Sequence, residues 1–141
     1  MTRTVFKDDH KEWFTPTEAL TSIPDGNGGW LTAAIGARSL SGMPSADGYG
    51  HLVFFFHDNE FIGWDSRYVS MMIENVEGAG VGRFKVTYAS YKPEDALCCP
   101  SLPDKIVFYQ WNNSTKRFDA SDLLTNQQYG YGNLLEVIYL P

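Results

Sequence analysis

The sequence lacks any long apolar segment. No stretch approaches the ~20 consecutive apolar residues that a membrane-spanning helix requires. The N-terminal stretch MTRTVFKDDHKEWF is charged and has no apolar core of the kind that defines a signal peptide. We therefore expect no transmembrane segment in this chain. The protein is either cytoplasmic or an exported protein whose leader was removed and replaced by an initiator Met.

Positive charge is also scarce. The chain has 11 Lys and Arg against 17 Asp and Glu, a net charge of −6, and its pI is about 4.9. An acidic surface repels phosphate groups, so nucleic acid and anionic membranes are not expected partners. The charge fits either a basic protein partner or solubility alone, and solubility is the simpler explanation.

Cysteine is nearly absent, since the only two residues, Cys98 and Cys99, are adjacent in EDALCCPS. Neighbouring Cα atoms lie about 3.8 Å apart, below the ~4.4 Å of an unstrained disulfide. A Cys98–Cys99 disulfide would therefore be strained and easily reduced. Structural zinc sites need C-x₂₋₄-C spacing and two further ligands, which this pair does not supply. The remaining alternatives are a strained disulfide, or one buried thiol and one loop thiol in a proline-braced corner.

Catalytic motifs are missing as well. GNGG and GAGVG do not match G-x-G-x-x-G, and no Walker A, HExxH or G-x-S-x-G sequence occurs. His57, Asp58 and Glu60 include metal-ligating types, but we interpret HDNE as a turn with a solvated flank. A thiol enzyme with His57 as the base for Cys98 or Cys99 rests on residue types alone. We therefore expect no metal, no cofactor and no enzymatic activity.

Apolar and aromatic residues, by contrast, are abundant. They make up 43% and 15% of the 141 residues. A chain of this length buries roughly two-thirds of the surface that it exposes when unfolded. We therefore expect a single domain over residues 1–141 with its own core.

The first predicted element is a short helix over residues 15–23, TPTEALTSI. Thr15 fits the N-cap position, Pro16 the first helical position, and Glu18 completes a capping box. The glycine-rich stretch PDGNGG ends the helix.

From residue 30 onward the pattern is that of extended strands. HLVFFFHDNEFIGWD predicts two strands joined by a tight turn at Asp58 and Asn59, because these residue types tolerate positive φ. YVSMMIENV, RFKVTYASY and KIVFYQW predict further strands, and residues 112–116 a second turn. The tail NLLEVIYLP fits an edge strand or a short helix. The predicted fold class is α+β: one short N-terminal helix packed on a largely antiparallel sheet of about five to seven strands.

The aromatic residues are the remaining candidates for binding. Exposed Trp and Tyr on a sheet face form recognition surfaces, although core packing is the simpler explanation for most of them. The predicted binding residues are Trp64, Tyr68, Tyr91, Trp111, Tyr129 and Tyr131.

The order of these landmarks resembles the LppP/LprE lipoprotein family. The corresponding features are the FFHDN turn at residues 55–59, Gly63 in the return strand, Tyr91 at a strand end, the cysteine loop at residues 97–101, and Trp111. The resemblance implies a small domain of the bacterial envelope that is either exported or attached by a lipid anchor upstream of this chain, and it implies no reaction.

This resemblance covers residues 15–122 and departs from the family pattern in two places. Asn59 stands where the family has glycine, a mild change because Asn also tolerates the left-handed region. Residues 123–141 form a C-terminal extension without a counterpart.

Two functions follow from these observations. The preferred one is a non-enzymatic, extracytoplasmic binding or structural module of the cell envelope, in the periplasm or at the cell surface. The alternative is an acidic inhibitor or immunity-type protein that binds and blocks a protein partner through charge and aromatic anchors.

Overall fold

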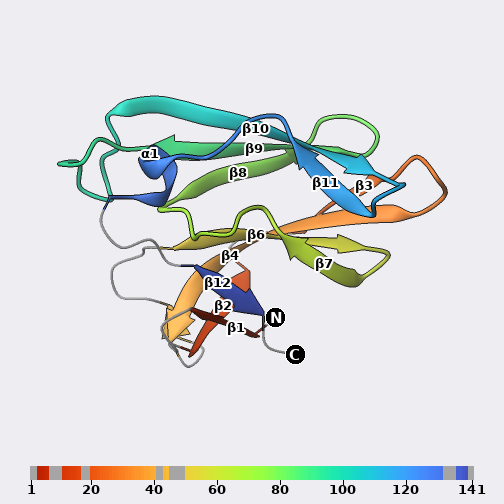
Figure 1. Ribbon diagram of the computed structural model, residues 1–141, viewed down its shortest axis with the longest axis horizontal. Helices are drawn as coiled ribbons and strands as arrows, with labels where there is room; N and C mark the ends of the chain where they lie inside the picture. Colours follow the sequence, from red (N-terminus) through yellow and green to blue (C-terminus); the bar gives the residue numbers. More distant parts are fainter. Residues whose placement is uncertain are drawn as a thin grey trace.

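Two antiparallel sheets packed face to face form the fold (Figure 1). The computed structural model describes residues 3–6, 11–16, 20–40, 43–44, 50–131 and 136–139, with side chains over 20–38, 50–131 and 136. Every strand pairing within the described residues is antiparallel.

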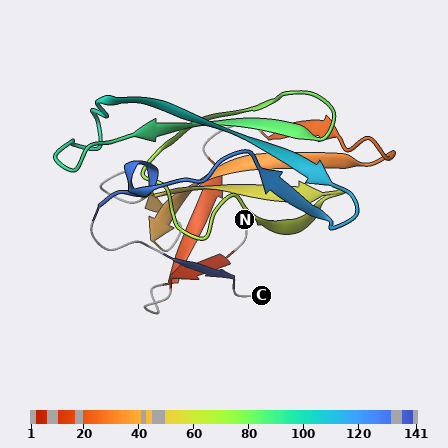
Figure 2. The same ribbon diagram turned by 45° about the horizontal axis from the view of Figure 1, so that its top comes forward.

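The first sheet has eight strands along the path β12-β1-β2-β4-β6-β7, and β3 and β5 also pair with β4. Its strands are β1 (Arg3–Phe6), β2 (Lys11–Pro16), β3 (Thr21–Pro24), β4 (Trp30–Leu40), β5 (Met43–Pro44), β6 (His51–His57), β7 (Glu60–Trp64) and β12 (Val137–Tyr139). The long strand β4 pairs with β3 near its start and with β2 near its end. Strands β1, β2 and β12 lie on the side of β4 and β6 that faces away from the second sheet (Figures 1 and 2).

The second sheet has four strands in the order β11-β10-β9-β8. Its strands are β8 (Ile73–Gly78), β9 (Arg83–Ser90), β10 (Leu102–Asn112) and β11 (Arg117–Ala120). The one helix within the described residues is the single turn α1 (Asn126–Tyr129), which follows β11.

The main core lies between the two sheets. On β9 and β10 every second side chain points inward, as the alternating sequences predict, and the same period of two holds on the facing strands. The core residues are Ile23, Leu31, Ala33, Ile35, Val53, Phe55, Ile73, Val76, Phe84, Val86, Tyr88, Val107, Tyr109 and Trp111. A smaller cluster of Leu52, Phe54 and Val69 lies on the other face of the first sheet.

The predicted N-terminal helix is wrong, and with it the α+β fold class. The residues assigned to it fall in the end of β2 and in β3, with residues 17–19 outside the described range. Thr21 to Pro24 pair residue by residue with β4, and Ile23 is 7% exposed in the core. The capping residues do not produce a helix, because so short a helix is only marginally stable without tertiary packing. Pairing with β4 is more favourable, because it buries Ile23 and satisfies the hydrogen-bonding groups of the backbone.

The predicted hairpins are confirmed. β6 and β7 are joined by Asp58 and Asn59, whose φ angles of 47° and 69° are both positive. β10 and β11 are joined by the predicted turn, in which Lys116 has φ of 57°. The tail forms a strand, β12, over the part that is described.

Candidate functional site

A cavity of about 320 Å³ opens between β7 and β11, the edge strands of the two sheets. These two strands lie one above the other in Figure 1, and the inner strands β6 and β10 supply the floor. The cavity is lined by Phe55, Ile62, Gly63, Trp64, Asp65, Tyr109, Arg117, Phe118 and Ala120.

Aromatic rings form the walls of this cavity. The rings of Phe55 and Phe118 are stacked with centroids 4.4 Å apart, and Tyr109 lies 5.4 Å from Phe55. These contacts join β6 of one sheet to β10 and β11 of the other. The walls are therefore set by packing between the sheets and depend little on loop conformation.

A carboxyl group lines the cavity beside these rings. Asp65 follows β7, and its backbone N–H donates to the Val53 carbonyl at 3.1 Å while its Oδ1 accepts from the Val53 N–H at 2.8 Å. Its Oδ2 accepts a 2.7 Å hydrogen bond from the Tyr88 hydroxyl. Burial raises the pKa of Asp65 to about 6, despite the opposing effect of these hydrogen bonds.

The hydrogen bonds continue to a second tyrosine. The hydroxyls of Tyr88 and Tyr109 lie 2.6 Å apart. Because the single proton of Tyr88 is donated to Asp65, Tyr109 must be the donor in this second bond. Burial, with the nearby Asp65 charge, also raises the pKa of both tyrosines far above the usual value, so both stay protonated at neutral pH.

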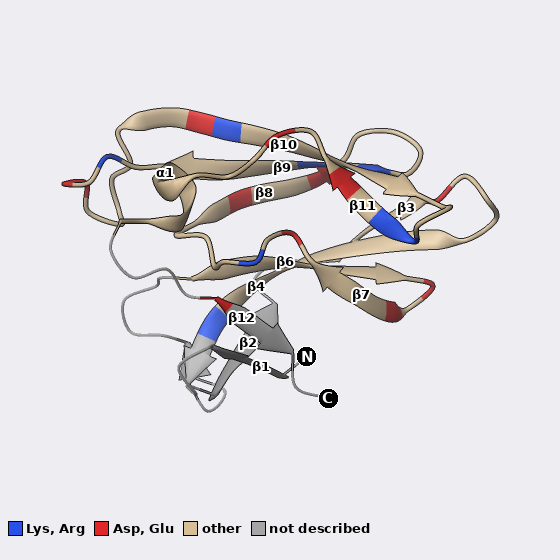
Figure 3. Ribbon diagram, in the orientation of Figure 1, with Lys and Arg blue, Asp and Glu red and all other residues tan. Residues whose placement is uncertain are grey.

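Arg117 brings a positive charge to the mouth of the cavity. It is exposed at the start of β11, where Figure 3 shows a basic segment. No ion pair to Arg117 or to Asp65 occurs among the residues with described side chains. Among the described side chains, the cavity thus carries a carboxyl group inside and a guanidinium at its rim, each without an ion-pair partner.

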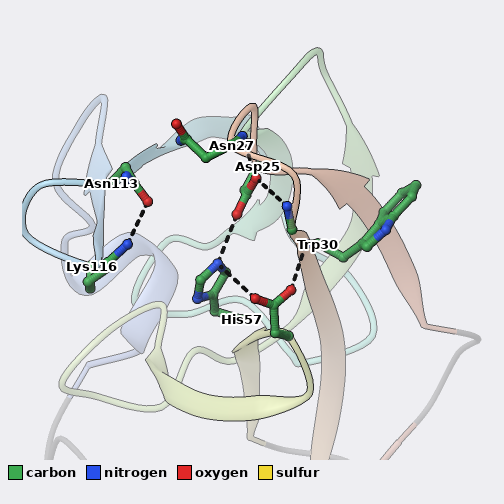
Figure 4. A network of polar contacts seen from close by, with 8 residues as sticks. Asp25, Asn27, Trp30, His57, Asn113 and Lys116 are labelled. Atoms are coloured by element: carbon green, nitrogen blue, oxygen red, sulfur yellow. Dashed lines mark hydrogen bonds and ion pairs between the residues drawn. The ribbon is translucent and has the colours of Figure 1, made fainter.

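A second polar cluster lies where the β3–β4 and β6–β7 turns meet (Figure 4). Nε2 of His57 lies 2.9 Å from Asp25 Oδ2 and 3.5 Å from Asp58 Oδ2. Asp25 Oδ1 accepts from the N–H groups of Asn27 and Gly29, and Asp58 Oδ1 accepts from the Trp30 N–H. These contacts fix the two turns to each other.

The composition of this cluster favours a structural role. The Asn27 N–H and then the His57 ring hold the pKa of Asp25 below its usual value. The His57 ring also lies against Trp111, with centroids 4.7 Å apart. No group of three metal-ligating side chains close enough to hold an ion occurs among the described residues.

The predicted binding aromatics do not gather at one place. Trp64 lines the cavity, whereas Tyr91 is fully buried and Trp111 is 6% exposed in the core. Tyr68 and Tyr129 pack against each other at 5.4 Å beside the helical turn.

Tyr131 is the most exposed of the six predicted aromatics, at 44%. Its hydroxyl donates to the Tyr91 carbonyl at 3.1 Å, which fixes the ring against the loop that follows β9.

Cys98 and Cys99 lie in this same loop, between β9 and β10, and their sulfur atoms are joined as a disulfide. Both residues are exposed. Asp95 braces the loop by accepting from the Lys92 and Ser101 N–H groups at 2.9 Å. The loop lies at the opposite end of the molecule from the β6–β7 turn that carries His57 (Figures 1 and 2), so the structure does not bring the cysteines and His57 together.

Most residues of the cavity were not candidates at the level of sequence. Asp65 follows β7, Tyr109 lies in β10, and Arg117 and Phe118 lie in β11, so only the two-sheet packing brings these residues together. One signal was present: Asp65 directly follows the apolar run FIGW at residues 61–64, and an acidic residue beside an apolar strand is a candidate for a perturbed carboxyl group.

The fold and the cavity define a class of protein, a small antiparallel β-sandwich with a ligand-sized cavity at its edge. The family model for LppP/LprE lipoprotein matches residues 31–114, more than half of the chain. The chain belongs to this family. The match runs from β4 into the turn after β10, so it includes Asp65 and the cysteines, while Arg117 and Phe118 lie beyond it. No curated protein and no solved structure matches the chain.

Among the described residues, no helix has the length and apolar character needed to cross a bilayer.

Proposed function

We propose that this protein is a non-catalytic module of the bacterial envelope that binds a small ligand in the cavity between β7 and β11. The cavity is the observation that carries the proposal. Its volume of about 320 Å³ falls in the range of small-molecule sites, and its walls combine aromatic rings with a few polar groups. Membership of a lipoprotein family supports a location outside the cytoplasm.

The non-catalytic part of the proposal rests on how the polar groups are used. Asp65 accepts hydrogen bonds on both oxygens, from the Val53 N–H and the Tyr88 hydroxyl, and the described residues that line the cavity include no Ser, Thr, Cys, Lys or His that it could activate as a nucleophile. His57, the residue best suited to acid–base chemistry, bonds Asp25 at the other polar cluster. We therefore expect the ligand to be bound and released unchanged.

A cavity-filling substitution tests the proposal. Ala120 is exposed and lines the cavity, so Ala120→Trp should fill the cavity without disturbing the core. Ile106→Trp is the matched control, because Ile106 is 44% exposed on the outer side of β10. In a small-molecule screen followed by NMR, ligands should shift the amide signals of β7 and β11 in the parent and in Ile106→Trp, and should fail to do so in Ala120→Trp.

The same screen can reject the proposal. Ligand shifts that persist in Ala120→Trp place the binding site elsewhere. Conversion of a bound compound into a product contradicts the non-catalytic part. Recovery of the natively expressed protein in the cytoplasmic fraction contradicts the location.

One observation favours the second function, an acidic inhibitor of a protein partner. Trp30, which begins β4 after the β3–β4 turn, and Val81, in the β8–β9 turn, are 57% and 62% exposed. The two turns adjoin, since a Cβ on Gly26 in the first would meet Val81 in the second at 3.1 Å. An exposed Trp is a common interface anchor. A stoichiometric partner recovered from the native organism at low salt should be lost with Trp30→Ala and kept with Leu123→Ala, since Leu123 is 79% exposed away from these turns. A partner kept by both variants argues against this surface.

A further inference from the structure

We infer that the ligand of the β7–β11 cavity is a small zwitterion that carries an ammonium group and an acidic group on an apolar body. The ammonium group faces Asp65 and Tyr109, and the acidic group faces Arg117. This inference rests on the proposed function and adds the chemical class of the ligand.

The inner end of the cavity offers hydrogen-bond acceptors. The Tyr109 proton is committed to Tyr88 and the Tyr88 proton to Asp65, so Tyr109 presents only its oxygen lone pairs to the cavity. The carboxylate of Asp65 is acceptor-only when ionised. A ligand group that enters here must therefore donate hydrogen bonds, as an ammonium group does.

The same end carries negative charge that no described residue neutralises. Asp65 makes no ion pair among the described side chains, although its side chain is partly buried. A partly buried charge without a counter-ion carries a desolvation cost, so a cation that enters the cavity removes an existing penalty. The faces of the surrounding aromatic rings add a further attraction for a cation.

The outer end has the opposite character. Arg117 is exposed, lines the cavity, and has no carboxylate within ion-pair distance among the described residues. A guanidinium recognises carboxylate and phosphate groups through paired N–H donors. The two ends together select a ligand with opposite charges at its own two ends, and Ile62, Phe55 and Phe118 surround the apolar part between them.

Binding of phenylalanine, compared with two matched compounds, tests this inference. 2-Phenylethylamine keeps the ammonium group without the acid, and 3-phenylpropionate keeps the acid without the ammonium group. Titration calorimetry at pH 7 should give phenylalanine at least about tenfold tighter binding than either compound, because each lacks one ionic contact. Phosphoethanolamine, whose primary ammonium group keeps its N–H donors, distinguishes the source: binding tighter than that of phenylalanine assigns the zwitterion to a lipid headgroup, and weaker binding assigns it to an amino acid.

Two charge-removing variants test which end of the ligand contacts Asp65 and which contacts Arg117. Asp65→Asn should weaken phenylalanine and 2-phenylethylamine and leave 3-phenylpropionate unchanged or tighter. Arg117→Gln should weaken phenylalanine and 3-phenylpropionate and leave 2-phenylethylamine unchanged. Arg83→Gln is the control for loss of a guanidinium, since Arg83 stacks on Phe108 outside the cavity.

A pH series tests the contact between the ammonium group and Asp65 without a substitution. Asp65, with a pKa of about 6, ionises between pH 5 and 7, so 2-phenylethylamine should bind about tenfold tighter at pH 7 than at pH 5. The groups that face Asp65 from β9, β10 and α1 are Tyr88, Tyr109 and Tyr129, whose pKa values are all raised and which do not titrate in this range.

The outcomes separate this inference from the proposed function. Equal binding of 3-phenylpropionate and phenylalanine, or tighter binding of an uncharged analogue such as ethylbenzene in the cavity, overturns the zwitterion and leaves the binding function intact. Absence of any ligand in the cavity, in this series and in the broader screen, overturns both.

Discussion

The hydroxyl of Tyr88 in β9 donates a 2.7 Å hydrogen bond to the Asp65 carboxylate at the end of β7. This bond crosses from one sheet to the other inside the sandwich. The bond stabilises the ionised form of a partly buried carboxylate, but the raised pKa of Asp65 indicates that the hydrogen bonds do not fully offset the loss of hydration. Sites that bind charged ligands commonly keep such a deficit, because the ligand then completes the set of partners.

The first prediction concerns stability against pH. The pKa of Asp65 is raised from 3.8 in the unfolded chain to about 6, so the native state binds more protons than the unfolded state between pH 4 and 6. Stability from this group is therefore present below pH 4 and is lost as the pH rises through 6, by about 3 kcal/mol in total. Asp65→Asn should gain stability relative to the parent by about this amount between pH 4 and 7.5.

Urea unfolding followed by tryptophan fluorescence measures this difference at each pH. Glu74, whose pKa is raised to about 7 by its hydrogen bond with Asp104, also titrates in this range, but it does so in both proteins. The difference between variant and parent isolates Asp65. A difference that stays constant from pH 4 to 7.5 contradicts the prediction.

The second prediction concerns Gly29, in the turn before β4. A Cβ at this position would lie 2.6 Å from Asp25 Oδ2 and 2.8 Å from Asp58 Oδ1. Both carboxylates are fixed by hydrogen bonds to backbone N–H groups, so neither can retreat without losing partners. Gly29→Ala should therefore destabilise the fold by about 2 kcal/mol in chemical unfolding.

Gly28→Ala is the comparison for this effect. Gly28 has φ of +88°, and a Cβ added there would meet no described atom within 4 Å, so its substitution carries only the backbone cost of about 1 kcal/mol. If Gly29→Ala destabilises the fold less than Gly28→Ala does, the prediction that Asp25 and Asp58 leave no room for a Cβ at Gly29 is wrong.

Local sequence patterns were sufficient for the second sheet and for the turns. The alternation in RFKVTYASY separates buried Phe84, Val86 and Tyr88 from their neighbours because the side-chain period of a strand is two. Asp58 and Asn59 tolerate positive φ, which identified the β6–β7 hairpin. Each of these two signals depends only on residues that are a few positions apart in the sequence.

The first sheet was less predictable because its pairing is non-local. The sequence TPTEALTSI carries real helix-start signals, and only β4, which comes later in the chain, supplies the edge with which Thr21 to Pro24 pair. One missed pairing changed the predicted architecture from a sandwich to a single sheet under a helix. The cavity could then not be predicted, because its walls form only where the edges of the two sheets meet.

The third prediction concerns the C-terminal segment, which lies beyond the residues that resemble the family. Gln128 in α1 is 2% exposed, and its Nε2 donates to Ser90 Oγ at 2.8 Å. Its Oε1 accepts from the Thr125 N–H at 2.9 Å and completes a capping box. Gln128→Ala should leave the buried Ser90 hydroxyl without this partner and cost about 2 kcal/mol.

The neighbouring exposed residue provides the control. Asn126→Ala should change the free energy of unfolding by less than about 0.5 kcal/mol. Equal, small effects of both substitutions would mean that the segment after residue 122 is not part of the folded unit.

The last prediction concerns Cys98 and Cys99. Protein purified without reductant should take up no thiol-alkylating reagent, and two equivalents after mild reduction, because an exposed disulfide between adjacent residues is open to attack. Cys98→Ser should leave one reactive thiol. The double variant Cys98→Ser/Cys99→Ser should lose less than about 1 kcal/mol of stability, since a disulfide stabilises by restricting the unfolded chain and this one closes the shortest of loops. Alkylation before reduction would show that the two sulfur atoms are free thiols, and a larger loss of stability would show that the disulfide stabilises the fold by more than closing its short loop.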